Sequence, residues 1–320
     1  MKRRQFLSLA PAVTLGTLGV SFLPASTARA EGKGTQFTAV QRFSLGDWTV
    51  TALGDGYLPL GEGVLQGITT EAAKELAAAA YFDTDNMVVG VNAYVVETGS
   101  DLILIDVGTG TAFGPTLGLL ANNLKAAGYA PEDATTILAT HLHPDHIGGC
   151  LIDGANPFVN AKMVATQADF DFFTSDEIRA QAPEAFRGFF DLAKAVTGFF
   201  ADKLTLIGAA EVSVAPGITA IPLPGHTLGH VGYMLESGGE SLLIWGDVLH
   251  VPGVQFARPD VTVAFDIDQE TARKTRMAIL DQVATDRQLV AGMHMSFPGF
   301  GYVEKAAEGY RFVPAPWRFS

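Results

Sequence analysis

Apolar residues occur along the chain in short runs bounded by glycine, proline or polar residues, a pattern typical of β-strands that alternate with helices. The runs at residues 43–50 and 51–53 predict the first strands. The segment MVVGVNAYVVETGSDLILIDVG, residues 87–108, contains two runs rich in valine and isoleucine. They are joined around Gly99 and Ser100, so this segment predicts a β-hairpin.

A helix and a buried strand are expected next. Residues 114–130, GPTLGLLANNLKAAGYA, predict an amphipathic helix because Pro115 suits a first helical turn and Gly128 a stop. Residues 135–146, TTILATHLHPDH, predict an apolar strand that ends where a group of histidines begins. These histidines should therefore lie on a loop that leaves a buried strand, where α/β enzymes place their chemistry.

The second half of the chain repeats this order weakly. Residues 236–250, ESGGESLLIWGDVLH, again combine a hairpin turn, an apolar strand and an aspartate. Residues 268–286 predict a helix, and an apolar strand with a histidine follows. The order strand-aspartate, helix, strand-histidine thus occurs twice, with Asp106 near the first histidines and Asp247 near His294. Two packed βα layers with polar side chains at one edge would follow.

The first thirty residues differ from the rest. Residues 1–30 carry four basic and no acidic residues, an apolar middle and the ending ARA, which predicts a cleavable export signal. Arg3 and Arg4, followed by Gln-Phe-Leu, resemble the twin-arginine type; an ordinary secretory signal is the alternative. We expect a periplasmic or otherwise exported protein in which residues 31–320 form one α/β domain.

The remaining chain is acidic. The formal net charge is −13, and it becomes −17 without the four basic residues of the signal. No basic stripe remains to neutralise phosphates, which argues against nucleic acid or an anionic membrane surface as a partner. Cys150 is the only cysteine, so no internal disulfide is expected, and its apolar neighbourhood favours a buried structural role.

Seven histidines lie on or beside the loops expected after strands. They are His141, His143, His146, His226, His230, His250 and His294. Imidazole and carboxylate are the ligands that suit zinc, and also iron, cobalt or manganese. In a His-x-His pair on an extended segment both side chains point the same way, so His141 and His143 can bind one ion.

A second ion fits the same run. Asp145 and His146 follow the bend at Pro144 and can face that ion. Each ion needs three to four ligands, so others must come from elsewhere. The obvious suppliers are His226, Asp247 and His294.

The six-residue run from His141 to His146 matches His-x-His-x-Asp-His, the signature of the metallo-β-lactamase superfamily, which the chain resembles over essentially its whole mature length. The resemblance implies an αβ/βα four-layer sandwich with two divalent metal ions per chain, zinc or else cobalt, manganese or iron. It assigns one ion to His141, His143 and His226, the other to Asp145, His146 and His294, and a bridging role to Asp247. True β-lactamases of the family have cysteine or serine at the bridging place, so antibiotic hydrolysis is disfavoured.

A narrower resemblance rests on the segments THLHPDHIGG, PGHTLGH, GDVLHVPGVQF and HMSFPGFGYV. They are similar to the exported methyl parathion hydrolases and to their lactone-hydrolysing relatives, the dihydrocoumarin hydrolases. This resemblance implies hydrolysis of a small apolar or aromatic lactone, ester or phosphotriester, and a homodimer. Two departures, Asp171 in place of an aromatic residue and His250 in place of an aliphatic one, argue against efficient phosphotriester turnover.

The expected chemistry is attack by a metal-bridging hydroxide on a lactone or aryl ester carbonyl. Asp145 or His250 is the candidate proton donor to the leaving group, and the alternative for His250 is a pocket wall without catalytic duty. His230 is expected to brace the loop that carries His226. Asp106 is expected to orient a ligand rather than to bind metal.

Aromatic residues supply the candidate substrate pocket. Phe113 matches a pocket aromatic of the resembled group, and Phe170, Phe172 or Phe173 could line an apolar pocket near the site. A phenylalanine stripe within residues 186–200 is interpreted as core or subunit interface. The loop with Leu58 and Leu60 is expected to cover the opening.

Three classes of function follow. The leading prediction is a dinuclear metal hydrolase of lactones or aryl esters, with phosphotriesterase activity as a side activity or an alternative. A glyoxalase II-like thioester hydrolase or a mononuclear iron dioxygenase is the second. A non-catalytic binding protein is the third, and the retention of every ligand position argues against it.

Overall fold

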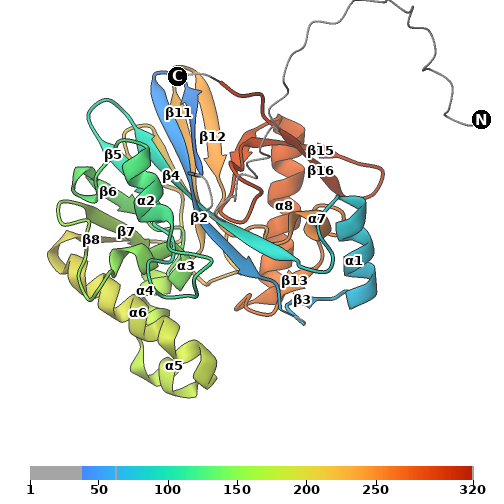
Figure 1. Ribbon diagram of the computed structural model, residues 1–320, viewed down its shortest axis with the longest axis horizontal. Coiled ribbons are helices and arrows are strands. Elements are labelled where there is room, and N and C mark those ends of the chain that lie inside the picture. Colours follow the sequence, from blue (N-terminus) through green and yellow to red (C-terminus); the bar gives the residue numbers. More distant parts are fainter. Residues whose placement is uncertain (1–37, 62, 319–320) are drawn as a thin grey trace, which may run out of the picture. The chain divides into compact units, whose positions relative to one another are not determined.

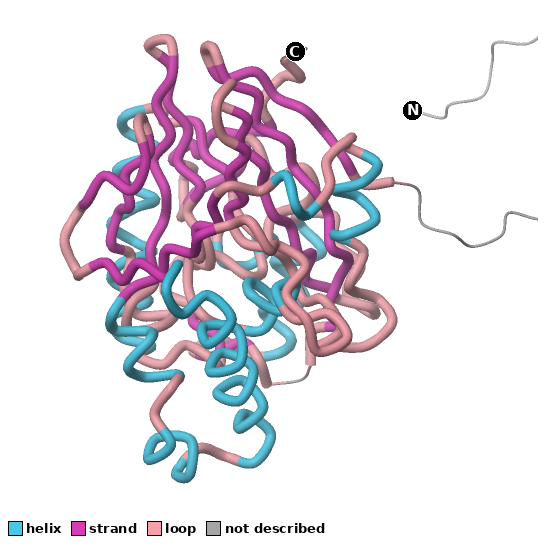
Figure 2. Tube along the Cα trace, turned by 90° about the vertical axis from the view of Figure 1, so that its left-hand side faces the viewer, coloured by secondary structure: helices cyan, strands magenta, loops and turns pink. Residues whose placement is uncertain are grey.

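Two sheets of seven strands each form the centre of the computed structural model, which describes residues 38–61 and 63–318 (Figures 1 and 2). The residues from Thr38 onward form one compact unit. The predicted export signal, residues 1–30, lies outside the described residues, so export stays a prediction. Homodimer formation also stays a prediction. Within the described residues, no helix is long and apolar enough to span a membrane.

The first sheet contains antiparallel strands from the N-terminal part and parallel strands after them. In spatial order its strands are β1 (Val40–Leu45), β2 (Trp48–Pro59), β4 (Val88–Glu97), β5 (Leu102–Ile105), β6 (Thr136–Leu138), β7 (Lys162–Thr166) and β8 (Leu204–Ile207). Strands β5 to β8 are parallel to one another, so their carboxyl ends meet at one edge.

The second sheet has a matching plan. In spatial order its strands are β16 (Tyr310–Pro314), β15 (Gly301–Lys305), β14 (Leu289–Ala291), β12 (Glu240–Ile244), β11 (Val231–Ser237), β10 (Ile218–Pro222) and β9 (Val212–Ala215). Strands β12 and β14 are its parallel pair. A separate two-stranded ladder joins β3 (Leu65–Gln66) to β13 (Thr262–Val263).

Helices cover the outer faces of the two sheets. The α-helices are α1 (Thr70–Ala79), α2 (Leu120–Ala126), α3 (Pro144–Ile147), α4 (Gln167–Phe173), α5 (Asp176–Gln181), α6 (Glu184–Phe200), α7 (Pro252–Gln255) and α8 (Gln269–Asp286). Short 3-10 turns are η1 (Pro131–Asp133), η2 (Gly148–Cys150) and η3 (Ala201–Lys203). Figure 1 shows α2, α4 and α6 on the side of the first sheet and α8 on the side of the second.

Successive side chains of β5 point to opposite faces of the first sheet and pack in two different layers. Leu102 and Leu104 pack with α2 and α6 on the helix-covered face, whereas Ile103 and Ile105 pack between the two sheets. Such alternation is expected because successive residues of a strand point to opposite faces. The second sheet packs its other face on α8. The predicted αβ/βα four-layer sandwich is therefore confirmed.

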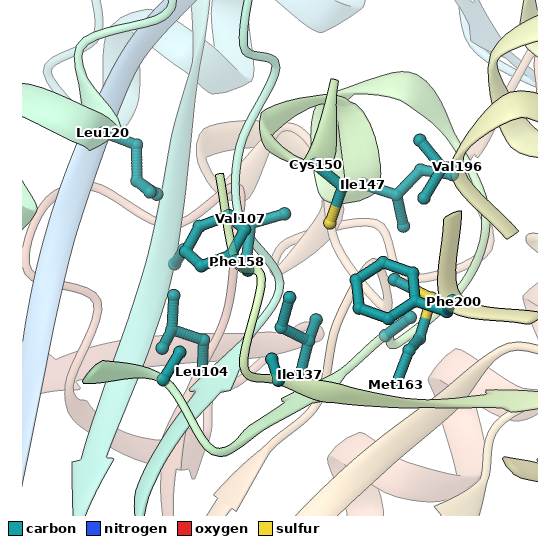
Figure 3. Close-up of a cluster of buried hydrophobic side chains, with 14 of the residues drawn as sticks. Leu104, Val107, Leu120, Ile137, Ile147, Cys150, Phe158, Met163, Val196 and Phe200 are labelled. Atoms are coloured by element: carbon teal, nitrogen blue, oxygen red, sulfur yellow. The ribbon is translucent and has the colours of Figure 1, made fainter. Parts of the chain in front are cut away.

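The cluster between the first sheet and its helices includes side chains that directly follow the histidine-rich run in sequence (Figure 3). Ile147, directly after His146, packs in this cluster, as does Cys150. Burial raises the pKa of the Cys150 thiol above its ordinary range, which fits the structural role expected for it. This core anchors the loop that carries the first metal-ligand candidates.

Several expected elements are present where the sequence predicts them. The hairpin around Gly99 and Ser100 is formed by β4 and β5, and α8 and β14 occupy the predicted helix and strand of the second half. Strands are present at the start of the domain as expected, but their predicted bounds at residues 43–50 and 51–53 are wrong, because a turn at Gly46 and Asp47 separates β1 from β2. Gly46 has a φ of +56°, a backbone conformation that glycine adopts without strain.

The helix expected at residues 114–130 is shorter than predicted, since α2 begins at Leu120. The buried carboxylate of Asp55 accepts hydrogen bonds from the backbone N–H groups of Thr109, Gly118 and Leu120 at 3.0, 3.2 and 2.9 Å. A carboxylate stabilises a helix where the first N–H groups are free. Asp55 therefore sets the start of α2, and Pro115 lies in the loop before it.

Candidate metal centre

Seven polar side chains converge at the edge where the parallel strands of both sheets end. His141 and His143 follow β6, and Asp145 and His146 lie in the one-turn helix α3, although the sequence had placed every histidine outside helices. His226 lies between β10 and β11, Asp247 follows β12, and His294 follows β14. The six other than Asp145 are buried, and the Asp145 side chain is 13% exposed.

Three histidines form the first group. Nε2 of His141 lies 3.0 Å from Nδ1 of His143, which lies 3.0 Å from Nε2 of His226. Burial lowers the pKa of His141 and of His143 well below the ordinary value. Neutral imidazoles carry a free lone pair, so the rings of His141 and His143 are suited to bind a cation.

Asp145, His146 and His294 form the second group. Oδ2 of Asp145 lies 3.5 Å from Nε2 of His146 and 3.5 Å from Nε2 of His294. Burial acts to raise the pKa of Asp145, but His146 and His294 outweigh it and hold the pKa below the usual range. Asp145 is therefore ionised in this surrounding.

Asp247 joins the two groups. Its Oδ2 lies 3.3 Å from Nε2 of His226 in the first group, and 3.2 and 3.0 Å from Nε2 of His146 and of His294 in the second. Burial favours a raised pKa for Asp247, yet His146 and His294 hold it well below its usual range. One carboxylate oxygen thus faces both candidate sites.

The donor set fits divalent cations. Within the part of the chain that the structure describes, the buried Nε2 of His146 and Oδ1 of Asp247 make no hydrogen bond. Buried polar atoms without partners are rare in native proteins, and a ligand atom facing a cation is a satisfied one. Imidazole nitrogen and carboxylate oxygen are ligands of zinc, and a carboxylate can bind two metals.

The outer nitrogens of the ligand candidates are themselves bound. Nδ1 of His146 lies 2.6 Å from Oδ2 of Asp106, and Nδ1 of His226 lies 2.8 Å from Oδ1 of Asp266. Nδ1 of His294 lies 2.7 Å from the carbonyl oxygen of Gly90. Such contacts fix the ring and leave the inner nitrogen for the metal. The expected contact of Asp106 with a ligand is present, whereas Asp266 was missed, since a lone aspartate before a helix carries no sequence signal for this role.

His230 contacts the loop that carries His226, as expected, and it also contacts the backbone of Asp247. Its Nδ1 lies 2.7 Å from the carbonyl oxygen of Leu223, and its Nε2 accepts the backbone N–H of Asp247 at 2.9 Å. It therefore ties the loop of His226 to Asp247 itself. The contact needs Gly246, because a Cβ there would lie 2.4 Å from Nε2 of His230.

Asp169 ties the two histidine loops together and was not singled out from the sequence. Its buried carboxylate accepts the backbone N–H of Gly229 at 2.7 Å, the hydroxyl of Thr227 at 2.8 Å and the backbone N–H of Leu142 at 3.3 Å. Burial raises the pKa of Asp169 to about 6. Leu142 lies between His141 and His143, so this carboxylate fixes the first group from both sides.

His250 lies within the site. Its Nε2 is 3.1 Å from Oδ2 of Asp247, and its ring stacks on His294 at 4.9 Å between centroids. Burial lowers the pKa of His250 to about 4, so the ring is neutral and can donate its Nε2–H to Asp247. Its backbone N–H donates to Gln255, which fixes the loop. Its catalytic role stays a prediction.

A cavity of about 200 Å³ opens over the two groups. Phe113 lines it, as do Leu58 and Leu60 of the segment expected at the opening. Phe186, Phe189 and Phe265 line it as well, although the sequence did not predict them there. Phe186 and Phe189 belong to the stripe interpreted as core or interface. Phe190 and Phe200 of this stripe are core residues and Phe189 packs against that core, but Phe186 and Phe189 also face the pocket.

The other predicted pocket residues lie elsewhere. Phe172 and Phe173 line a neighbouring cavity that also borders His143, and Phe170 lines neither cavity. Asp171 is exposed, and its carboxylate accepts a hydrogen bond from Gln167 at 2.8 Å. Asp171 lines neither of these two cavities, so its departure from an aromatic residue gives no support to the expectation of poor phosphotriester turnover.

Comparisons with known proteins place these features in a family context. A family model described as the metallo-beta-lactamase superfamily matches residues 86–294. An N-acyl homoserine lactonase from a Bacillus species is 30% identical over 118 residues, which cover 37% of this chain and 39% of that protein. The chain thus spans about two fifths of the length of that curated relative.

Two solved structures are similar over most of the chain. The crystal structure of AbOPH, described as a hydrolase in the beta lactamase superfamily, has a TM-score of 0.82 and 31% identity, and the match covers 89% of this chain and 100% of that one. AidC, described as a dizinc quorum-quenching lactonase in complex with a product, has a TM-score of 0.82, 24% identity and coverage of 88% and 99%. At that identity the second likeness concerns the fold.

Proposed function

Because the chain belongs to the metallo-beta-lactamase superfamily, we propose that it is a metal-dependent hydrolase that opens lactones or cleaves esters at the carbonyl carbon. The observation that carries the proposal is the position of Asp247. Its Oδ2 faces imidazoles of both ligand groups at the floor of an apolar cavity. Two cations and a small uncharged substrate would meet at this point.

The ligand roles follow from the two groups. His141, His143 and His226 would hold one divalent cation, Asp145, His146 and His294 would hold the other, and Asp247 lies near both groups. Zinc suits these donors best, and cobalt, manganese or iron would also fit them. Two such ions supply a water of lowered pKa and a positive charge that polarises the substrate oxygen.

The chain's own residues orient the reaction. The rings of Phe113, Phe189 and Phe265 exclude water from the cavity and hold an apolar substrate against its floor. Asp145 is the partly exposed carboxylate at that floor and is ionised, so it accepts a proton rather than supplying one at the start. It can then pass the proton to the leaving oxygen. His250 positions Asp247 by donating its Nε2–H.

Lactones are favoured among the possible substrates for two reasons. The relative that is 30% identical is named an N-acyl homoserine lactonase. The pocket walls are apolar, and a lactone is uncharged and largely apolar. Phosphotriester and thioester hydrolysis are the alternatives that the same assay must separate.

The test is the initial hydrolysis rate of the metal-loaded protein on dihydrocoumarin, an N-acyl homoserine lactone, methyl paraoxon and a thioester. His143→Ala is the control, because it removes one ligand of the first group. We expect the lactone rates to exceed the others and to fall to background in the variant. Dominant turnover of methyl paraoxon or of the thioester would replace the lactonase proposal, and background rates on all four would overturn it.

A further inference from the structure

A second cavity adjoins the one at the metal centre. It has a volume of about 340 Å³ and lies among α4, α5, α6 and residues 264–267. The two cavities share four wall residues, namely His143, Phe186, Phe189 and Phe265. Figure 1 shows α5 and the start of α6 extending away from the sheets.

The walls of the second cavity are apolar. Beyond the four shared residues, the lining includes the large apolar side chains of Phe172, Ile178, Phe190 and Ile267. Asp266, the carboxylate in this lining, already accepts hydrogen bonds from His226 and from the backbone N–H of Val263, the latter at 3.0 Å. Its carboxylate is therefore already hydrogen-bonded within the fold. The cavity presents few polar groups that would disfavour an apolar ligand.

The ring of Phe189 is one of the shared walls of the two cavities. It lies edge-on to Phe113, His143 and Phe186, with centroid distances of 6.3, 5.7 and 5.5 Å. Phe186 is 39% exposed, so this group of rings packs on the core on one side only. Ring contacts of this kind are weak and tolerate displacement, unlike a hydrogen-bonded wall.

We propose that the second cavity binds a flexible apolar chain of the substrate, while the reacting lactone or ester group lies at the metal centre. The chain passes beside Phe189 and lies against Ile178 and Phe190. The proposal rests on the proposed function and makes it narrower. It favours a lactone with a long acyl chain over a compact aromatic lactone, which would fill the first cavity alone.

The proposal predicts how kcat/KM depends on the length of the acyl chain of the substrate. Burial of one methylene group is worth up to about fourfold in affinity, so kcat/KM should rise steeply as an acyl chain begins to fill the second cavity. The probes are N-acyl homoserine lactones with butanoyl, hexanoyl, octanoyl and decanoyl chains. We expect the decanoyl compound to exceed the butanoyl compound by about tenfold or more.

A matched pair of variants locates the effect. Ala182 lines the second cavity, whereas Ala180 is exposed on α5 and lines neither cavity. Ala182→Trp would fill the space and should reduce kcat/KM on the decanoyl compound by about tenfold, with little change on the butanoyl compound. Ala180→Trp should leave both unchanged. An equal loss on both chains, or no loss in Ala182→Trp, would overturn the proposal.

A binding measurement separates this proposal from the proposed function. The ring-opened products, N-butanoyl and N-decanoyl homoserine, are titrated calorimetrically into the metal-loaded protein. Tighter binding of the decanoyl product that is lost in Ala182→Trp supports the subsite even if no lactone is hydrolysed. Equal binding of both products contradicts it. A change of oligomeric state in Ala182→Trp by light scattering, without a change of chain preference, would assign the cavity to an interface between copies.

Discussion

The metal centre and the aromatic pocket above it meet at His143, but they are held together by different forces. Around the centre, Nδ1 of His146 and of His226 lie 2.6 and 2.8 Å from aspartate oxygens. In the pocket, the ring of Phe189 lies edge-on to those of Phe113, His143 and Phe186, the nearest with a centroid distance of 5.5 Å. One region is fixed by directional bonds and the other by packing.

This difference separates chemistry from substrate choice. Charge-assisted hydrogen bonds fix the direction of an imidazole lone pair, so the places for the cations are narrowly defined. Ring packing tolerates replacement at a modest cost. We therefore expect changes at the centre to abolish metal binding and turnover, and changes in the pocket to alter the substrate while the metals stay.

The largest effect is expected from Asp247→Asn. The amide is neutral and presents only one acceptor oxygen to the histidines that the carboxylate faces. Activity should fall by roughly a thousandfold or more. Steady-state kinetics on the best lactone, with metal content measured on the same sample, checks this. Activity within about tenfold of the wild type would show that Asp247 is dispensable.

A smaller effect is expected when an outer contact is removed. Asp106→Asn replaces the carboxylate bound to His146, at a backbone φ of 58° that asparagine tolerates. Metal affinity should fall by about 10- to 100-fold, as measured by competition with a chromogenic chelator. Asp171→Asn, at an exposed site, is the control. Equal affinities in the two variants would contradict the role of Asp106.

In the pocket, Phe113→Ala should raise KM for the lactone without changing metal content. Loss of one aromatic wall removes apolar contact worth a few kcal/mol at most, so a rise of about tenfold is expected. Kinetics and metal analysis of the purified variant measure both quantities. A loss of bound metal in Phe113→Ala would contradict the separation between a metal centre that sets the chemistry and a pocket that sets the substrate.

The smallest effect is expected from Phe170→Ala. Phe170 is partly buried on α4 and lines neither cavity. KM and metal content should stay within about twofold of the wild-type values, because no pocket contact is removed. A rise in KM similar to that of Phe113→Ala would place Phe170 in the pocket after all.

The sequence predicts the centre better than the pocket, and the reason is physical. His141, His143, Asp145 and His146 lie within six positions of one strand end, so local geometry brings them together. Asp247 and the later histidines could be found because they also follow strands. Phe265 comes from a loop after β13 and reaches the pocket only through the tertiary fold.

The polar contacts behind the ligands were partly hidden for the same reason. Asp106 follows β5 and was noticed, whereas Asp169 lies within α4 and Asp266 in an irregular segment. Each accepts bonds from residues at least forty positions away or from loops on another element. A single sequence carries no signal of such pairings. The start of α2 was missed because Asp55, which sets it, lies in β2.

Metal stoichiometry tests the central claim most directly. The purified protein is freed of metal, titrated with zinc and analysed for bound metal at equilibrium, alongside Asp247→Asn. We predict two zinc ions per wild-type chain, with hydrolysis appearing as the pair is completed, and fewer than two in the variant. One ion per fully active wild-type chain, or two in the variant with unchanged affinity, would contradict a dinuclear centre joined by Asp247.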